Sequence, residues 1–131
     1  MIVDTNVLLD VLNDDPAWVD WSLQQLNAQS QVHRLAINAV IYAELSLSFS
    51  CAQALDDTVT SMQLVMLDIP KPALFLAGKA FAQYRRRGGT KSNVLSDFFI
   101  GAHAAVSGLP ILTRDTSRYS SYFPTVRLVA P

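Results

Sequence analysis

The 131-residue sequence predicts a single α/β domain, a three-layer α/β/α sandwich around a mostly parallel central sheet. Two observations lead to this class. Short apolar runs alternate with longer segments whose apolar residues recur at helical spacing, and strands separated by helices favour a parallel sheet covered on both faces. No internal repeat, linker or low-complexity segment interrupts the alternation. Residues 1–131 are therefore expected to share one core.

The N-terminal half is expected to open with a strand, because its first apolar run stops at Asp4. Apolar residues then recur at helical spacing in four segments. These segments are residues 6–12, 16–28, 39–49 and 51–62. Asp15 and Asn38 precede two of them as N-cap residues, and Pro16 suits a first helical position. A second strand is expected at residues 32–37.

The C-terminal half is expected to hold two long helices and the remaining strands. The strands are expected at residues 64–69, 110–113 and 126–129, of which the first is either a strand or an extended connection. The helices are expected at residues 70–87 and 94–107, with an irregular or short helical connection over 114–122. Gly88 and Gly108 follow the two long helices, and glycine readily adopts the left-handed conformation of a helix C-cap.

Composition restricts the functional classes. The net charge is −1, whereas a protein held on nucleic acid by charge alone is normally strongly basic, so any nucleic-acid contact must be local. A lone cysteine, Cys51, favours a reducing compartment, and the cytoplasm is the expected location. The opening residues lack the pattern of a signal peptide, and the longest uncharged run, residues 98–113, is too short to span a bilayer. No membrane contact is expected.

Four acidic residues fall where packing alone does not call for a charge. Asp4 directly follows an apolar run and Asp115 lies just beyond the end of the strand expected at residues 110–113, and open parallel sheets bind ligands beyond the carboxyl ends of their strands. Glu44 and Asp97 lie on apolar helix faces, where a carboxylate is costly unless it is paired or binds a metal. Alone, Asp4 or Asp115 would be an ordinary cap or turn residue, and Glu44 could pair with a buried arginine. Together the four predict a shared site.

Such a site favours divalent cations and phosphodiester chemistry. Converging carboxylates repel one another, so protons or cations must neutralise them. Oxygen ligands without His or Cys nearby select Mg²⁺ or Mn²⁺, and a cation held in this way can orient water and stabilise a leaving oxygen at phosphorus. Thr5, Asn6 and Thr113 are expected to hydrogen-bond the ligating oxygens. The predicted catalytic and metal-binding residues are Asp4, Glu44, Asp97 and Asp115.

The segments around these acids resemble the successive motifs of the PIN domain family, over nearly the whole chain. The matching segments are residues 3–9 (VDTNVLL), 43–45 (AEL), 97–104 (DFFIGAHA) and 112–115 (LTRD). Each motif is weak alone, whereas four in this order and spacing are specific. The length more narrowly resembles the VapC-type toxins of bacterial toxin-antitoxin pairs.

The resemblance implies a Mg²⁺- or Mn²⁺-dependent endoribonuclease that cuts RNA and whose acidic quartet matches the four acids one by one. Thr113 matches a position where a small hydroxyl residue is common. The family further implies a homodimer. It also implies inhibition by a cognate antitoxin, whose C-terminal segment lies over the acidic site.

The densest basic cluster of the chain consists of Arg85, Arg86, Arg87 and Lys91. It precedes Asp97 by about ten residues and has two interpretations. Either it binds RNA phosphates near the site, with Arg114 and Arg118 assisting, or it is a solvated helix end whose cations complement the helix dipole.

Two other classes compete with the nuclease. A receiver-like signalling domain is also small, α/β and Mg²⁺-binding, but it requires a paired acid at the first strand and a late lysine. Here Asp4 is followed by Thr5 and Asn6, and no lysine follows Lys91. A catalytically silent binding module with the same fold is the remaining alternative.

Overall fold

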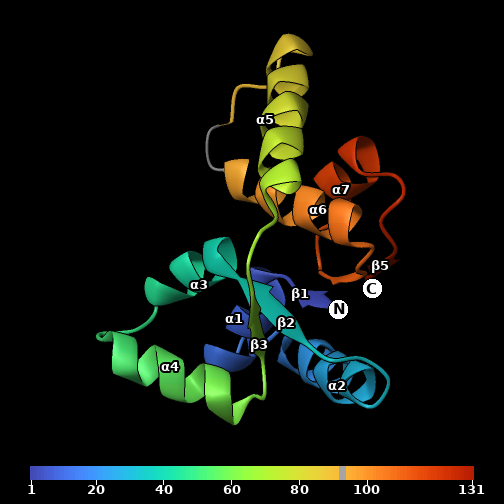
Figure 1. Ribbon diagram of the computed structural model, residues 1–131. Helices are drawn as coiled ribbons and strands as arrows, with labels where there is room; N and C mark the ends of the chain where they lie inside the picture. The colour runs from blue at the N-terminus through green and yellow to red at the C-terminus, as the bar shows by residue number, and fades with distance from the viewer. Residues whose placement is uncertain (92–93) are drawn as a thin grey trace.

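A computed structural model describes residues 1–91 and 94–131 of the chain. In this part of the chain five parallel strands form one sheet in the order β3-β2-β1-β4-β5, with helices on both faces (Figure 1). The strands are β1 (Ile2–Val3), β2 (Ala36–Asn38), β3 (Val65–Leu67), β4 (Ile111–Leu112) and β5 (Leu128–Val129). The expected three-layer class is confirmed, and every strand pair of the described sheet is parallel.

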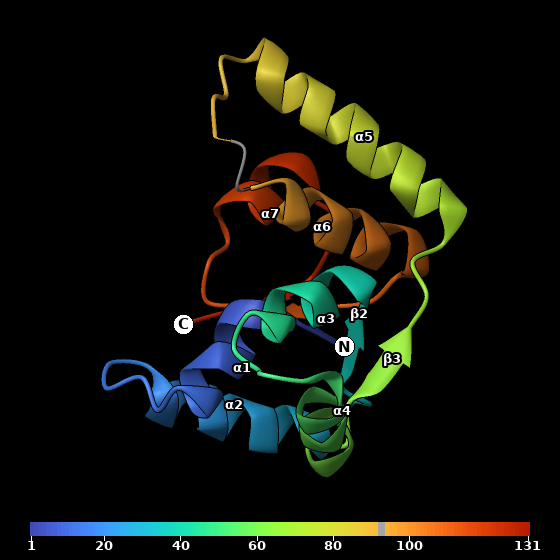
Figure 2. The ribbon, with the colours of Figure 1, turned by 90° about the vertical axis from the view of Figure 1, so that its left-hand side faces the viewer.

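The helices divide between the two faces as the strand order requires. They are α1 (Thr5–Leu12), α2 (Val19–Ser30), α3 (Ala39–Ser46), α4 (Ala52–Ser61), α5 (Lys71–Arg86), α6 (Leu95–Ser107) and α7 (Ser117–Tyr122). Figure 2 shows α5, α6 and α7 above the sheet and α1, α2 and α4 below it, while α3 lies between and contacts α6. Right-handed crossovers explain this division, because the chain crosses the sheet in one direction from β1 to β3 and returns to β4 and β5.

The centre of the sheet is the point at which the connections change face. Strands β1 and β4 are neighbours, and the N–H of Asp4 donates to the carbonyl of Leu112 at 2.9 Å. The chain leaves β1 into α1 on one face and leaves β4 towards α7 on the other. Ligands of open α/β sheets bind in the crevice at such a switch point, beyond the carboxyl ends of the strands.

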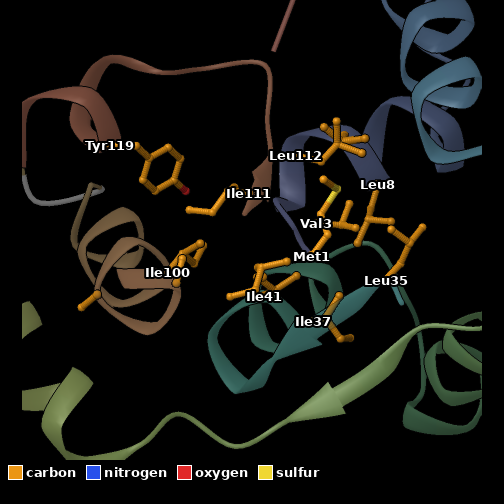
Figure 3. Packing of buried hydrophobic residues seen from close by; sticks show 14 of the residues in the cluster. Met1, Val3, Leu8, Leu35, Ile37, Ile41, Ile100, Ile111, Leu112 and Tyr119 are labelled. Carbon is orange, nitrogen blue, oxygen red and sulfur yellow. The ribbon is translucent and has the colours of Figure 1, made fainter. Parts of the chain in front are cut away.

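Buried apolar side chains pack around the carboxyl ends of the central strands. Ile37 of β2, Ile41 of α3 and Ile100 of α6 are completely buried, as are Ile111 and Leu112 of β4 (Figure 3). Central strands of a parallel sheet are covered on both faces, which is why their residues form continuous apolar runs. Burial of each such side chain contributes about 1.5–3 kcal/mol. The two strand ends that carry the acidic residues therefore rest on well-packed apolar side chains.

Two expected boundaries in the N-terminal half are wrong. The second helix begins at Val19, because the Asp15 side chain caps a separate turn by accepting from the N–H groups of Ala17 at 2.9 Å and Trp18 at 3.0 Å. The second strand covers Ala36–Asn38, whereas Val32 lies in a turn and is 73% exposed. Local signals placed both elements too early in the chain.

Other local expectations hold, apart from the end of α3. The Asn38 side chain caps α3 by accepting from the N–H groups of Val40 and Ile41 at 3.1 and 3.0 Å. The helix ends at Ser46, three residues before the expected end. The apolar run at residues 64–69 contains strand β3, and the connection over 114–122 contains the short helix α7. Among the described helices none is both long and apolar enough to cross a membrane.

Candidate functional site

Asp4 is the most completely held of the acidic residues. It is the N-cap of α1, where the extended backbone turns into the helix, and its Oδ1 accepts from the Thr5 N–H at 2.8 Å. Its Oδ2 accepts from the Thr113 hydroxyl and from the Tyr119 hydroxyl, both at 2.8 Å. Burial raises the pKa of Asp4, although the hydrogen bonds that it accepts oppose the rise. Its carboxylate is therefore rigidly oriented at the end of β1.

Thr113 connects the two central strand ends. While its hydroxyl donates to Asp4, it accepts from the N–H of Asp115 at 3.1 Å and from the Asn6 amide at 3.3 Å. The Asn6 amide also lies 3.4 Å from the second oxygen of Asp4. Thr113 and Asn6 were predicted to hydrogen-bond the oxygens of the acidic residues, and both lie within hydrogen-bond distance of Asp4. Their part in metal binding stays a prediction.

Glu44 approaches from α3 and is half-buried. Its Oε1 accepts from the Thr5 hydroxyl at 2.6 Å, so Thr5 joins Asp4 through its backbone and Glu44 through its side chain. The alternative of a buried arginine partner is not realised in the described part of the chain, where no salt bridge reaches Glu44.

Asp97 lies in the first turn of α6, the helix that contacts α3. Burial raises its pKa from 3.8 to about 7, and the negative charges of Asp4, Asp115 and Glu44 contribute to the rise. Arg118 opposes it, with Nε 3.9 Å from Oδ2 of Asp97. Because charges influence one another strongly only at short range, this pKa indicates that Asp4, Glu44 and Asp115 all lie near Asp97.

Asp115 lies in a different environment on the exposed rim. Its Oδ1 accepts from the N–H and the hydroxyl of Ser117, at 3.1 and 2.8 Å. These hydrogen bonds hold its pKa below the ordinary value, and the charges of Arg118 and Lys91 lower it further. Asp115 is thus an ionised carboxylate at neutral pH, whereas Asp97 is poised to exchange a proton.

The donor set fits a hard divalent cation. Within residues 1–91 and 94–131, no three His, Cys, Asp or Glu side chains are close enough to hold a metal ion by themselves. However, the acidic side chains at this edge offer carboxylate oxygens, which suit Mg²⁺ or Mn²⁺, and Mg²⁺ normally keeps several waters among its ligands. The negative charges of Asp4, Asp115 and Glu44, which add to the effect of burial on the pKa of Asp97, are charges that a cation would compensate.

The model of the PIN domain family matches residues 1–121. The chain belongs to the PIN domain family. Comparison with curated proteins gives no sequence match. The described strand order of this PIN domain also differs from the order 2-1-3-4-5 of receiver domains, so the receiver-like interpretation loses its support.

Solved structures with a similar fold include toxin-antitoxin proteins. VapBC2 from Rickettsia felis, bound to a DNA fragment from its promoter, aligns with a TM-score of 0.73 at 18% identity, over 98% of this chain and 96% of that one. DNA-bound VapBC from Salmonella typhimurium gives 0.71 at 20% identity, over 98% and 96%. A toxin-antitoxin complex from Klebsiella pneumoniae gives 0.65 at 21% identity, over 98% and 94%. At these identities the likeness concerns the fold of the PIN domain alone.

Tyr119 was not among the site residues predicted from the sequence. It is completely buried on α7, its ring points into the core beside Ile111 (Figure 3), and its hydroxyl donates to Asp4. Burial and the nearby negative charge of Asp4 raise its pKa well above the ordinary value, so the phenol keeps its proton. The sequence around Tyr119 shows only the helical spacing of Tyr119 and Tyr122. The contact with Asp4 joins positions 115 residues apart, so no local pattern predicts it.

The predicted basic cluster extends from the end of α5 towards the site of this PIN domain. Arg85 and Arg87 lie over the rings of Phe81 and Tyr122, at 5.1 and 5.4 Å. Arg86 is exposed, and Lys91 is close enough to lower the pKa of Asp115. The cluster therefore borders the acidic rim at its Lys91 end.

The remaining candidate RNA-binding residue, Arg114, already forms an ion pair within the protein. Its guanidinium forms a salt bridge with the buried carboxylate of Asp10, with Nε 2.6 Å from Oδ2. Asp10 and its partner Ser22, whose hydroxyl lies 2.6 Å from the same oxygen, were not predicted from the sequence. Arg118, by contrast, has an Nε without a hydrogen-bond partner in the described residues.

Proposed function

We propose that this PIN domain is a Mg²⁺- or Mn²⁺-dependent endoribonuclease. The observation that carries the proposal is the convergence of four carboxyl groups, from four separate segments, at the carboxyl edge of β1 and β4. Burial raises the pKa of Asp97 to about 7, and the negative charges of Asp4, Asp115 and Glu44 add to the rise. A site that only stabilised the fold would pair these charges with cations of the protein. Within the described residues Asp97 faces Arg118 at 3.9 Å, and no salt bridge reaches Asp4, Glu44 or Asp115. This excess negative charge supports a divalent cation as ligand.

Different residues of the chain would have different roles in the reaction. Asp4, Glu44, Asp97 and Asp115 would hold the cation and its waters. When bound, the cation supplies positive charge that polarises an attacking water and stabilises the oxygen leaving phosphorus. Thr113 and Tyr119 keep the Asp4 carboxylate in one orientation. Asp97 gives up its proton near neutral pH and becomes able to serve as a ligand.

The RNA would approach along the basic rim. The exposed side chains of Arg85, Arg86, Arg87 and Lys91 would contact backbone phosphates, which position a nucleic acid without reading its sequence. Arg118 would lie nearest the reacting phosphate, because its side chain faces Asp97. A path of this kind needs no basic surface elsewhere, in agreement with the net charge of −1.

We further propose that the protein is the toxin of a toxin-antitoxin pair, acts in the cytoplasm, and forms a homodimer. The fold that it shares with chains of toxin-antitoxin complexes supports this assignment. Large apolar side chains such as Phe75, which is 70% exposed, support coverage of part of its surface by a protein. The cognate antitoxin would inhibit cleavage by covering the acidic site.

Cleavage of total cellular RNA by the isolated protein tests the nuclease. We expect discrete fragments with Mg²⁺ or Mn²⁺, and none with chelator or in the Asp97→Asn variant. Asp20→Asn, which removes an exposed acid in the first turn of α2, is the matched control and should cleave normally. A folded protein that binds Mn²⁺ and RNA without cutting would instead support the catalytically silent binding module.

A further inference from the structure

We propose that Arg114 is a positioning residue, which holds the segment from Thr113 to Asp115 against α1 through a buried ion pair with Asp10. This role rests on the proposed nuclease site, and it replaces the RNA contact that the sequence suggested for Arg114. Four observations carry the proposal. They are the ion pair of the guanidinium, the aromatic ring that covers it, the backbone hydrogen bonds of the segment, and the burial of Asp10.

One edge of the Arg114 guanidinium, formed by Nε and Nη2, pairs with the Asp10 carboxylate. Its Nε donates to Oδ2 of Asp10 at 2.6 Å, and its Nη2 donates to Oδ1 at 2.9 Å. This fork-to-carboxylate geometry fixes both partners in orientation as well as in distance. The Ser22 hydroxyl, from α2, donates to the same Oδ2 at 2.6 Å. The pair thereby joins the segment after β4 to α1 and α2 together.

An aromatic side chain covers the guanidinium. The ring of Trp18 lies 4.9 Å from the central carbon of Arg114, and Trp18 packs edge-on against Trp21 at 6.1 Å. A cation over the face of an indole is attracted by the ring, and here the ring also limits access of water. The side chain of Arg114 is 26% exposed. It therefore resembles a packed structural group more than a free phosphate ligand.

The backbone of the same residue is attached to α1 independently. The N–H of Arg114 donates to the Asn6 side-chain oxygen at 3.1 Å. On one side, Thr113 donates to Asp4, and on the other, the N–H of Asp115 returns to the Thr113 hydroxyl. Arg114 thus stands between two residues of the acidic site, and its side chain ties both to the helix that Asp4 caps.

Turning Arg114 towards an RNA phosphate would be unfavourable. Asp10 is 2% exposed, and removal of its cation would leave a buried, uncompensated charge. Loss of the pair should therefore act through the geometry of Asp115 and Thr113, and so through the affinity for the divalent cation. Supporting residues around metal ligands typically change metal affinity by about 10–100-fold.

The test compares Arg114→Gln, Arg114→Lys and Asp10→Asn with the wild type. Arg34→Gln is the control, because Arg34 is exposed and lies at the opposite end of the sheet, before β2. Calorimetry measures Mn²⁺ affinity. Binding of a short fluorescent single-stranded RNA, without divalent cation and over a range of salt concentrations, measures phosphate contacts. Far-UV circular dichroism verifies folding of each variant.

A positioning role predicts that Arg114→Gln and Asp10→Asn each weaken Mn²⁺ binding by about 10–100-fold and leave the salt dependence of RNA binding unchanged. Arg114→Lys keeps the charge but loses the fork, so it should also bind Mn²⁺ more weakly. An RNA contact predicts the reverse: Arg114→Gln would lower the salt slope by about one, and Asp10→Asn would free the arginine and strengthen RNA binding.

The inference is overturned if wild-type Mn²⁺ affinity persists in Arg114→Lys, or if Asp10→Asn tightens RNA binding. If Arg114→Gln does not fold, Arg114→Lys and Asp10→Asn decide by the same two readouts. The wild-type protein tests the proposed function separately. A wild type that binds Mn²⁺ but never cuts RNA would refute the nuclease, while the metal affinities of the variants would still judge the role of Arg114.

Discussion

Replacement of Asp97 by asparagine should stabilise the cation-free protein at alkaline pH. The folded state raises the pKa of Asp97 from 3.8 to about 7, so it favours the protonated carboxyl. A group of this kind contributes stability that is fully present below about pH 4 and is lost as the pH rises through about 7. The difference of about three pH units corresponds to about 4 kcal/mol at most. Because the side chain is 29% exposed, screening by water reduces this to about 1–3 kcal/mol.

Chemical denaturation in the presence of chelator measures this effect. Near pH 4 the unfolding free energies of the wild type and Asp97→Asn should agree. At pH 8 the variant should be more stable by about 1–3 kcal/mol. Addition of Mg²⁺ should reverse the order at pH 8, because a ligand stabilises the state that binds it and the wild type keeps all four carboxylates. Equal stabilities at pH 8 without cation, with the control Asp20→Asn also unchanged, would refute the electrostatic reasoning.

Further changes test other parts of the molecule. Tyr119→Phe removes the hydroxyl that donates to Asp4, and denaturant titration at neutral pH should show a loss of about 1–3 kcal/mol; full stability would mean that this hydrogen bond contributes nothing. Gly101→Ala places a methyl group into the ring of Phe123, so the midpoint of thermal unfolding should fall, by an amount equivalent to about 1–3 kcal/mol, and Phe123→Leu in the same chain should recover part of it. An undiminished midpoint would show that the ring moves freely. Arg87→Ala should weaken binding of single-stranded RNA and lower the salt slope by about one, and an unchanged slope would remove Arg87 from the RNA path.

Sequence patterns sufficed for features that depend on neighbours along the chain. Asp4 was placed correctly directly after β1, and Asp115 lies three residues beyond the end of β4, because an acid that closely follows a short apolar run is a local pattern. The cap at Asn38 was recognised for the same reason. Local patterns also produced the errors, since Asp15 and Pro16 have the composition of a helix start but form a separate turn.

Contacts between distant segments could not be predicted in this way. A charge pattern identifies Arg114 as a cation, but its partner lies 104 positions away on α1. Tyr119 has the character of an ordinary core aromatic until the fold brings its hydroxyl to Asp4. The acids themselves were found because a carboxylate on an apolar face is anomalous wherever it occurs, whereas a tyrosine or a paired arginine is not.

The two central strands are each only two residues long. Beyond these strands, the N–H of Asp4 reaches the carbonyl of Leu112 at 2.9 Å, and this hydrogen bond lies at the edge where the acidic residues meet. Fraying of that end would separate Asp4 from Thr113 in the same event, and with it the segment that carries Asp115. Opening of this edge would therefore separate Asp115 from Asp4, while Thr5 would still join Asp4 to Glu44.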